Sequence, residues 1–320
     1  MNIIDFERPI TELESAINQL RRLKMERGVD RSREIAELEK ERERLLKTIF
    51  SHLTPWDKVL LARHPKRPYA LDYARSMCEG FMELHGDRLG FDDGAVVAGL
   101  ARIGSHKIAL VGHQKGRDLR ERQRRNFGMA KPEGYRKGMR IFDLAERFRL
   151  PVVTLVDTPA ADPGVESEAR GISEAIAASM MKMFELTVPT IAVILGEGGS
   201  GGAIGFATAN RVLMLEHSIY SVIPPEGCAA ILWRDPSKNR EASEALKLTA
   251  QSAMEMGLID GIIPEPLGGA HRDAQTTALS VRAAILHQLE ELGSKKPSEL
   301  QHERYEKFRQ MGIYQVKADI

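Results

Sequence analysis

Gly196-Glu197-Gly198-Gly199-Ser200-Gly201-Gly202-Ala203 is the stretch that decides the fold, and it stands between two apolar segments. The run at residues 191–195 predicts a buried strand, and the small residues after the glycines favour the start of a helix. The first turn of a helix leaves backbone N–H groups without partners, and glycine lets a substrate carbonyl approach them closely. The stretch therefore predicts a strand, a tight bend and a helix N-terminus that binds a developing oxyanion.

The same glycines fit two other hypotheses. Gly196, Gly198 and Gly201 match the G-x-G-x-x-G fingerprint of dinucleotide-binding enzymes, with Glu216 ending a later apolar run. Counted from Gly196, only about four turns of helix fit before the next predicted strand at residues 211–215, which counts against a nicotinamide-dependent dehydrogenase. Tight packing of glycines is the other alternative. A P-loop is excluded because no Gly-Lys-Ser/Thr follows.

The bulk composition is that of a globular protein of nearly neutral charge. The chain has 320 residues, of which 42% are hydrophobic, enough for a substantial core. Its 46 basic and 45 acidic residues nearly cancel, so we expect neither nucleic acid nor a membrane surface as a partner. Cys78 and Cys228 support neither a disulfide framework nor a structural zinc site. The start lacks a signal-peptide pattern and no apolar run has membrane length, so we expect a cytoplasmic protein.

Three segments are expected along the chain. Residues 1–54 carry two apolar stripes of helical period, separated by Gly28-Val29-Asp30, and predict a helical hairpin that must dock on the main domain or on a partner. Residues 55–293 alternate strand and helix patterns, which is typical of an α/β domain. The polar residues 294–320 predict a peripheral arm. Within the domain, strands are expected at residues 95–100, 108–112, 152–156, 191–195 and 212–215, and helices at 135–149, 166–185 and 274–292.

A proline-rich loop follows the strand at residues 152–156. Its sequence is Asp157-Thr158-Pro159-Ala160-Ala161-Asp162-Pro163-Gly164, and its two prolines hold it away from helix at a strand end, where α/β sheets bind ligands. Asp157 and Asp162 are candidate metal ligands, although helix capping or a salt bridge is the commoner role of loop aspartates.

A basic stretch follows the strand at residues 108–112. Lys115, Arg117, Arg124 and Arg125 suit phosphate groups, such as those of a coenzyme A thioester, but a solvated helix face has the same composition. His113 has the residue type of a general acid or base, while a lone histidine at a strand end is more often structural. No Gly-x-Ser-x-Gly elbow occurs, so we expect chemistry by backbone amides, with the cofactor supplying its own base.

Several separate blocks occur in the order found in one known family. They are Arg63-His64-Pro65, Gly112-His113-Gln114-Lys115-Gly116, Asn126-Phe127-Gly128-Met129, Pro132-Glu133-Gly134-Tyr135-Arg136-Lys137, Gly196 to Ala203, Tyr220-Ser221-Val222-Ile223, Pro225-Glu226-Gly227-Cys228-Ala229 and Ile263-Pro264-Glu265-Pro266-Leu267-Gly268-Gly269-Ala270-His271-Arg272. Over nearly the whole chain they closely resemble the carboxyltransferase α subunit of bacterial acetyl-CoA carboxylase.

The resemblance implies a crotonase-type fold, a spiral of ββα units, beside a β subunit that carries a zinc ribbon, in an α2β2 core that works with biotin carboxylase and the biotin carboxyl carrier protein. It implies transfer of carboxyl from carboxybiotin on the carrier to acetyl-CoA, giving malonyl-CoA for fatty acid synthesis. Backbone amides of Gly201, Gly202 and Ala203 would hold the ureido oxygen of biotin, with no metal in this subunit. The expected substrate-binding residues are Gly198, Gly199, Lys115, Arg117, Arg124, Arg125, Asp162, Glu226 and Gly227.

The chain departs from this family in a few places. The family usually has Thr-Pro-Gly-Ala-Tyr-Pro-Gly where this chain has Ala160 and Asp162, it differs again from Glu166 onward, and it has Ser where this chain has Pro224. Asp162 replaces aromatic surface by charge, and Ala160 resists a positive φ. These changes predict a divergent copy with altered acyl-CoA or inhibitor preference, or an assembly partner that has lost turnover.

Overall fold

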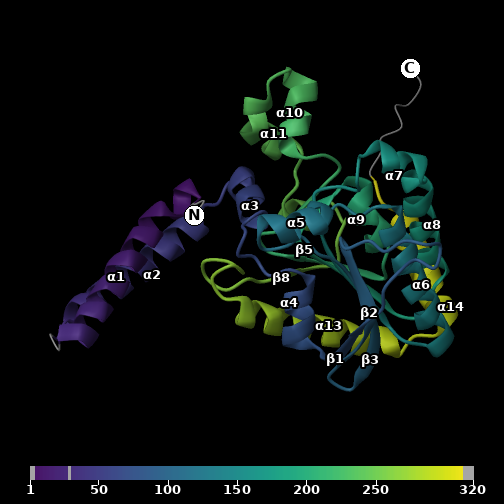
Figure 1. The fold of residues 1–320 in the computed structure, drawn as a ribbon, viewed down its shortest axis with the longest axis horizontal. Coiled ribbons are helices and arrows are strands. Elements are labelled where there is room, and N and C mark those ends of the chain that lie inside the picture. Colours follow the sequence, from purple (N-terminus) through teal and green to yellow (C-terminus); the bar gives the residue numbers. More distant parts are fainter. Residues whose placement is uncertain (1–3, 28–29, 313–320) are drawn as a thin grey trace, which may run out of the picture.

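The computed structural model describes residues 4–27 and 30–312. Within these residues an eight-stranded mixed sheet with helices on both faces forms the body, a helical hairpin projects from one side, and a short pair of helices stands out at another (Figure 1). None of the described helices has the length and apolar character needed to cross a bilayer. The expected turn at Gly28-Val29 and residues 313–320 of the expected arm lie outside the described residues.

In the described part of the chain, four α-helices come first, and strands and helices are interspersed after them. The strands are β1 Glu79–Glu83, β2 Val96–Ile103, β3 His106–His113, β4 Val152–Thr158, β5 Thr190–Gly199, β6 Arg211–Leu215, β7 Ile219–Ser221 and β8 Gly261–Ile263. The helices are α1 Arg8–Arg27, α2 Ser32–Phe50, α3 Pro55–Ala62, α4 Ala70–Met77, α5 Leu119–Arg124, α6 Pro132–Phe148, α7 Val165–Ala169, α8 Ile172–Glu185, α9 Ser200–Ala207, α10 Pro225–Trp233, α11 Asn239–Ala245, α12 Ala250–Glu255, α13 Ala274–Gly293 and α14 Pro297–Arg309. Short 3₁₀ turns lie at Asp5–Glu7, Asn126–Gly128 and Pro236–Lys238.

The sheet runs in the order β1-β2-β3-β4-β5-β6-β8, with β7 beside the end of β5. The first three strands are antiparallel and β3 to β8 are parallel. Every residue of β4 and β5 is buried because helices cover both faces, as their unbroken apolar runs predict. The five strands expected from the sequence are confirmed.

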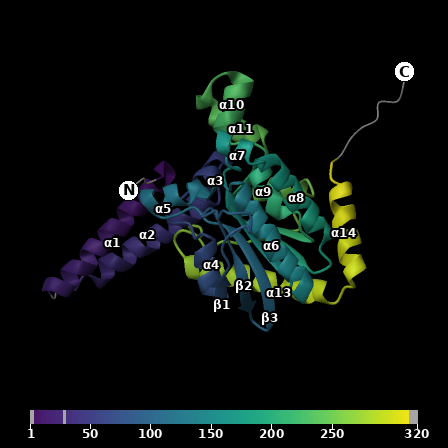
Figure 2. The same ribbon diagram turned by 45° about the vertical axis from the view of Figure 1, so that its right-hand side comes forward.

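Two cores lie on the two faces of the sheet. In β2, Val96 and Ala98 pack with α6, α8 and α9, while Val97 between them packs with α4 and α13, because successive residues of a strand face opposite ways. Figure 2 shows α6 and α9 on one side of the strands and α13 on the other. The carboxyl ends of β3, β4 and β5 are thereby left at one edge, where the glycine stretch lies.

Two helical expectations are corrected by the structure. The helix expected at residues 166–185 is two helices, α7 and α8, because Gly171 between them has a left-handed φ of 82°. The expected peripheral arm contains α14, whose Leu300 and Arg304 are buried against the body. Arg304 donates hydrogen bonds to the carbonyls of Met183 and Leu186 at 2.5 and 2.9 Å, which ties α14 to the end of α8.

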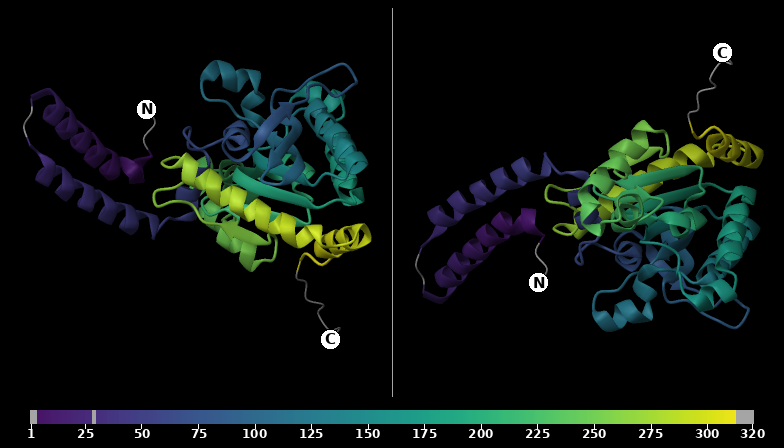
Figure 3. Two further views of the ribbon diagram at one scale, coloured as in Figure 1. Left: turned by 90° about the horizontal axis from the view of Figure 1, so that it is seen from below. Right: turned by 90° about the horizontal axis from the view of Figure 1, so that it is seen from above.

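The hairpin of α1 and α2 is attached to the body by its base. Glu7 accepts hydrogen bonds from Nε2 of His271 at 3.0 Å and from Arg272 at 2.9 and 3.0 Å, and Arg272 also reaches Glu14 at 2.6 Å. The rest of the hairpin stands away from the sheet in both views of Figure 3. The expected docking is therefore confined to the base.

Candidate active site at the start of helix α9

The glycine stretch joins β5 directly to α9. Gly198 pairs with β4 and β7, Gly199 is the N-cap of α9, and no side chain caps the helix. Ser200 has a positive φ of 51°, so regular helical backbone begins at Gly201. The N–H groups of the first turn, which include those of Gly201, Gly202 and Ala203, therefore have no acceptor inside the helix. The helix dipole adds positive potential at the same end. Helix geometry thus places the N–H groups of Gly201, Gly202 and Ala203 together at the end of α9 that attracts anions.

The loop after β4 packs on this joint. A Cβ at Gly199 would overlap the carbonyl of Pro159, and one at Gly202 would lie 2.5 Å from the carbonyl carbon of Ala160. A Cβ at Gly201 would meet no atom nearer than 3.5 Å, on a side chain of α8. The loop therefore requires glycine at 199 and 202, while a Cβ at Gly201 would make only ordinary van der Waals contacts.

Asp162 is occupied by hydrogen bonds within the loop. Its Oδ1 accepts from Nδ2 of Asn126 at 3.0 Å and its Oδ2 from Oγ of Ser167 at 2.5 Å. Burial raises the pKa of Asp162, but these hydrogen bonds outweigh it, so the pKa lies below its ordinary value. Ala160 does not adopt a positive φ, so the backbone conflict expected there is wrong. The geometry gives Asp162 a role in fixing the loop.

Charged side chains from distant parts of the chain meet behind the glycine stretch. Nζ of Lys115 lies 2.7 Å from both Asp157 and Glu197, and Arg63 reaches Glu197 at 2.7 Å and Glu226 at 2.5 Å. Lys115, predicted to bind phosphate, and Asp157, a candidate metal ligand, are therefore paired with each other. The sequence predicted no functional role for the side chains of Arg63 and Glu197. The Arg63-His64-Pro65 block was the available signal for Arg63.

The other expected phosphate-binding residues are divided. Arg117 stacks on the ring of Tyr69 at 4.2 Å and pairs with Asp72. Arg125 is buried and donates to the carbonyl of Gly94 at 2.9 Å. Arg124 at the end of α5 is exposed, with no ion pair to any other residue in the described ranges. The structure therefore does not gather these cations into one site.

His113 and Gly227 lie outside the glycine joint. His113 is buried with its ring centroid 5.2 Å from that of Phe206, and neither ring nitrogen has a hydrogen-bond partner among the described residues. Burial lowers the pKa of His113 to about 3, so it is a neutral core residue behind α9. Gly227 lies in α10, where a Cβ would be 3.2 Å from Ile223.

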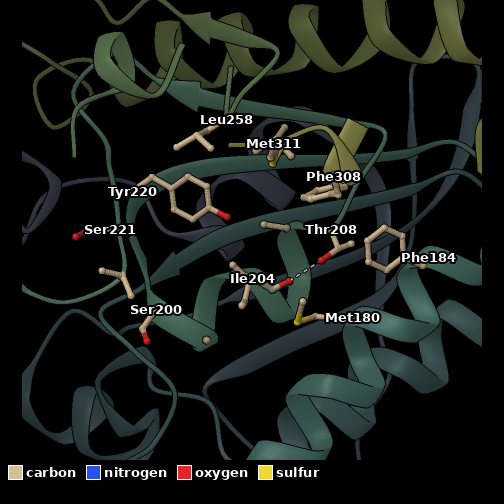
Figure 4. A pocket seen from close by; sticks show the side chains of 14 residues that line it. Met180, Phe184, Ser200, Ile204, Thr208, Tyr220, Ser221, Leu258, Phe308 and Met311 are labelled. Carbon is tan, nitrogen blue, oxygen red and sulfur yellow. Dashed lines mark hydrogen bonds between the residues drawn. The ribbon is translucent and has the colours of Figure 1, made fainter. Parts of the chain in front are cut away.

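An apolar cavity of about 390 Å³ opens beside the start of α9 (Figure 4). Gly201 and Ile204 of α9 form one wall, and side chains of α8, β7 and α14 form the others. The labelled residues that line it are Met180, Phe184, Ser200, Ile204, Thr208, Tyr220, Ser221, Leu258, Phe308 and Met311. A mainly apolar group of a ligand can therefore lie next to the free amides.

Comparisons with known proteins find similarity to one family over nearly the full chain. A model of the family described as acetyl co-enzyme A carboxylase carboxyltransferase-like matches residues 3–312. A protein of Acaryochloris marina named acetyl-coenzyme A carboxylase carboxyl transferase subunit alpha is 52% identical over 314 residues, covering 98% of this chain and 97% of that one. One of the same name from Fusobacterium nucleatum is 50% identical over 311 residues, covering 97% and 99%.

Solved structures share the fold at low identity. Transcarboxylase 12S, with methylmalonyl-coenzyme A bound, superposes with a TM-score of 0.59 at 21% identity over 72% of this chain and 42% of that one. A Pseudomonas malonate decarboxylase hetero-tetramer with coenzyme A gives 0.59 at 15% identity over 73% and 91%. The expected crotonase-like fold is confirmed by this likeness. Since the family model and the relatives span almost the whole sequence, the chain belongs to the acetyl co-enzyme A carboxylase carboxyltransferase-like family.

Proposed function

We propose that this chain, with a second subunit, transfers the carboxyl group of carboxybiotin to acetyl-CoA and so forms malonyl-CoA for fatty acid synthesis. The observation that carries the proposal is the N-terminus of α9, which no side chain caps and which packs against the loop after β4. The relatives of the chain are named as acetyl-coenzyme A carboxylase carboxyl transferase subunit alpha. The family match argues against the dehydrogenase alternative. In this chain, a member of the carboxyltransferase-like family, the glycines of the G-x-G-x-x-G pattern form the β5–α9 joint.

In this proposal, backbone N–H groups of the chain stabilise the negative charge of the reaction. The N–H groups of Gly201, Gly202 and Ala203 donate to the ureido oxygen of biotin and stabilise negative charge that develops there as the carboxyl group leaves. One such donor is worth about a hundredfold or more in rate. Biotin on its carrier protein supplies the carboxyl group and takes up the methyl proton of acetyl-CoA. The cavity beside Gly201 accommodates the hydrocarbon part of biotin.

The partner surface proposed here is α10, which stands out from the body with α11 (Figure 1). Its Ile231 and Leu232 are 70% and 65% exposed, and apolar residues that project together in this way mark association sites. The occupant is the β subunit that the name of the relatives implies, in an α2β2 core in the cytoplasm that receives the biotin carboxyl carrier protein charged by biotin carboxylase.

Reconstitution with a β subunit tests the proposal. Malonyl-CoA and free biotin are supplied, and carboxylated biotin and acetyl-CoA are measured. Carboxyl transfer supports the enzyme. A stable complex without transfer would indicate an assembly partner that has lost turnover, and transfer only from the carboxylated forms of longer acyl-CoAs would indicate altered preference. Binding of NAD by the chain would revive the dehydrogenase hypothesis.

A further inference from the structure

Three neighbouring parallel strands end in one buried ion-pair network. Lys115 follows β3, Asp157 lies in β4 and Glu197 lies in β5. Nζ of Lys115 is 2.7 Å from Oδ1 of Asp157 and 2.7 Å from Oε2 of Glu197, and the three side chains are 12%, 1% and 9% exposed. Since the carboxyl ends of these strands form the edge where ligands of α/β sheets bind, the network lies directly behind the glycine joint.

Glu197 is fixed through both its side chain and its backbone. Besides Lys115, its carboxylate accepts a hydrogen bond from Nε of Arg63 at 2.7 Å. Its own N–H donates to Oδ1 of Asp157 at 2.9 Å. The next residue, Gly198, pairs with both neighbouring strands, β4 and β7, so the backbone on the C-terminal side of Glu197 is held in place as well.

The network also controls charge near the free amides. Burial opposes ionisation of Glu197, but the cations of Lys115 and Arg63 outweigh it and lower its pKa below the ordinary value. Burial likewise raises the pKa of Asp157, whose Oδ2 has no partner among the described residues. Without Lys115, two buried carboxylates would lie side by side close to a group that must accumulate negative charge.

We propose that Lys115 and Glu197 are positioning residues for carboxyl transfer: they hold the β5–α9 joint so that the amides at the start of α9 face the ureido oxygen, and Lys115 offsets the charge of the two carboxylates beside it. The inference rests on the proposed function, but it concerns how these side chains hold the joint rather than a contact with biotin or acetyl-CoA. Their effect falls on the transition state, where the oxygen carries most charge, rather than on binding of the neutral ureido group.

Glu197→Gln and Lys115→Met test this in the reconstituted complex. Each should lower kcat of malonyl-CoA-dependent carboxylation of free biotin by roughly tenfold or more, while KM for biotin changes by less than about threefold. Lys115→Arg keeps the charge and should recover most of the activity. The matched control is Glu146→Gln, because half-buried Glu146 accepts from the N–H of Thr187 at 2.9 Å, before the other end of β5.

The outcomes separate the two proposals. A wild-type complex that transfers no carboxyl group refutes the proposed function itself. An active wild type with unchanged kcat in Glu197→Gln, or with an equal fall in Glu146→Gln, overturns the positioning role. So does a change confined to KM, or a Lys115→Arg variant as slow as Lys115→Met. If Lys115→Met does not fold, as thermal unfolding would show, Glu197→Gln and Lys115→Arg decide the matter.

Discussion

Two glycines at the start of α9 differ in whether a side chain fits there. In Gly202→Ala the new Cβ would lie 2.5 Å from the carbonyl carbon of Ala160, so the loop or the helix must move and misalign the amides. We expect carboxyl transfer to fall by about a hundredfold or more. In Gly201→Ala the Cβ has ordinary contacts from 3.5 Å outward and the N–H is retained, so the loss of activity should be much smaller than in Gly202→Ala. Steady-state rates of the reconstituted complex measure both, and equal losses would contradict this account.

Two buried histidines, His64 and His113, make the stability depend on pH. Burial lowers the pKa of His64 to about 4 and that of His113 to about 3, against an ordinary value of 6.5. Because these folded-state values lie below the unfolded value, the unfolded chain takes up protons first as the pH falls. Stability is therefore complete above about pH 6.5 and declines toward pH 4, by about 2 kcal/mol per histidine at pH 5.

Urea unfolding at pH 7 and pH 5 measures this loss. His113→Leu removes one titrating group, so the difference in unfolding free energy between the two pH values should shrink by about 2 kcal/mol. The absolute stability of the variant is not the readout, since any change in packing is common to both pH values. A variant with the full wild-type difference would show that His113 is protonated in the folded protein.

The residues of the site differ in how far sequence predicts them. The glycine joint is local, since a β-rich run followed by small residues fixes a strand, a bend and a helix start within a few positions. The partners of Lys115 are not local, because Glu197 is 82 positions away and nothing in either neighbourhood marks the pair. A basic stretch therefore predicted a phosphate site where the fold supplies buried carboxylates.

At the scale of elements, α14 shows how one buried cation attaches a polar helix. Arg304 is fully buried and bonds the carbonyls at the end of α8, at 2.5 Å for Met183. Arg304→Met should destabilise the chain by about 3 kcal/mol because those carbonyls lose their donor. The control is Arg309→Met on the same helix, where the side chain is exposed. Equal urea midpoints for the two variants would rule out this attachment.

The exposed apolar residues of α10 give a prediction about assembly. Ile231→Asp places a charge on the surface proposed for the β subunit and should weaken association by tenfold or more, roughly the cost of one lost buried side chain. Leu279→Asp is the matched control, because Leu279 is 52% exposed on α13, across the sheet. Titration of labelled chain with the β subunit gives both affinities. Equal affinity of Ile231→Asp and wild type would place the partner elsewhere.

Periodicity located the long elements and missed their interruptions. A helical pattern runs through residues 166–185, but Gly171 adopts a left-handed φ of 82° and divides it into α7 and α8. Apolar spacing carries no information about such a break, which depends on the backbone conformation of Gly171 between the two helices. Likewise α14 is polar in sequence, and its attachment depends on Arg304 meeting carbonyls of α8.

At the scale of the whole molecule, the order of the strands and the attachment of the hairpin depend on contacts between remote segments. The α/β class follows from alternating patterns. The docking of Glu7 on His271 joins residues 264 positions apart, so the hairpin could be predicted as a unit but its place on the body could not. That attachment is small, and neither of the two large cores of the sheet includes a residue of α1 or α2.

The hairpin should therefore serve assembly more than folding of the body. A chain lacking residues 1–50 keeps both cores intact, so it should unfold cooperatively with a β-sheet body of unchanged secondary structure. It loses two helices of about 30 Å that project with charged outer faces, and with them we expect the reconstituted complex to elute later from a sizing column than the lost mass explains. Arg272→Met keeps the hairpin but removes its main link to Glu7 and should give a partial shift. A truncated complex of full assembly size would show that the hairpin takes no part in it.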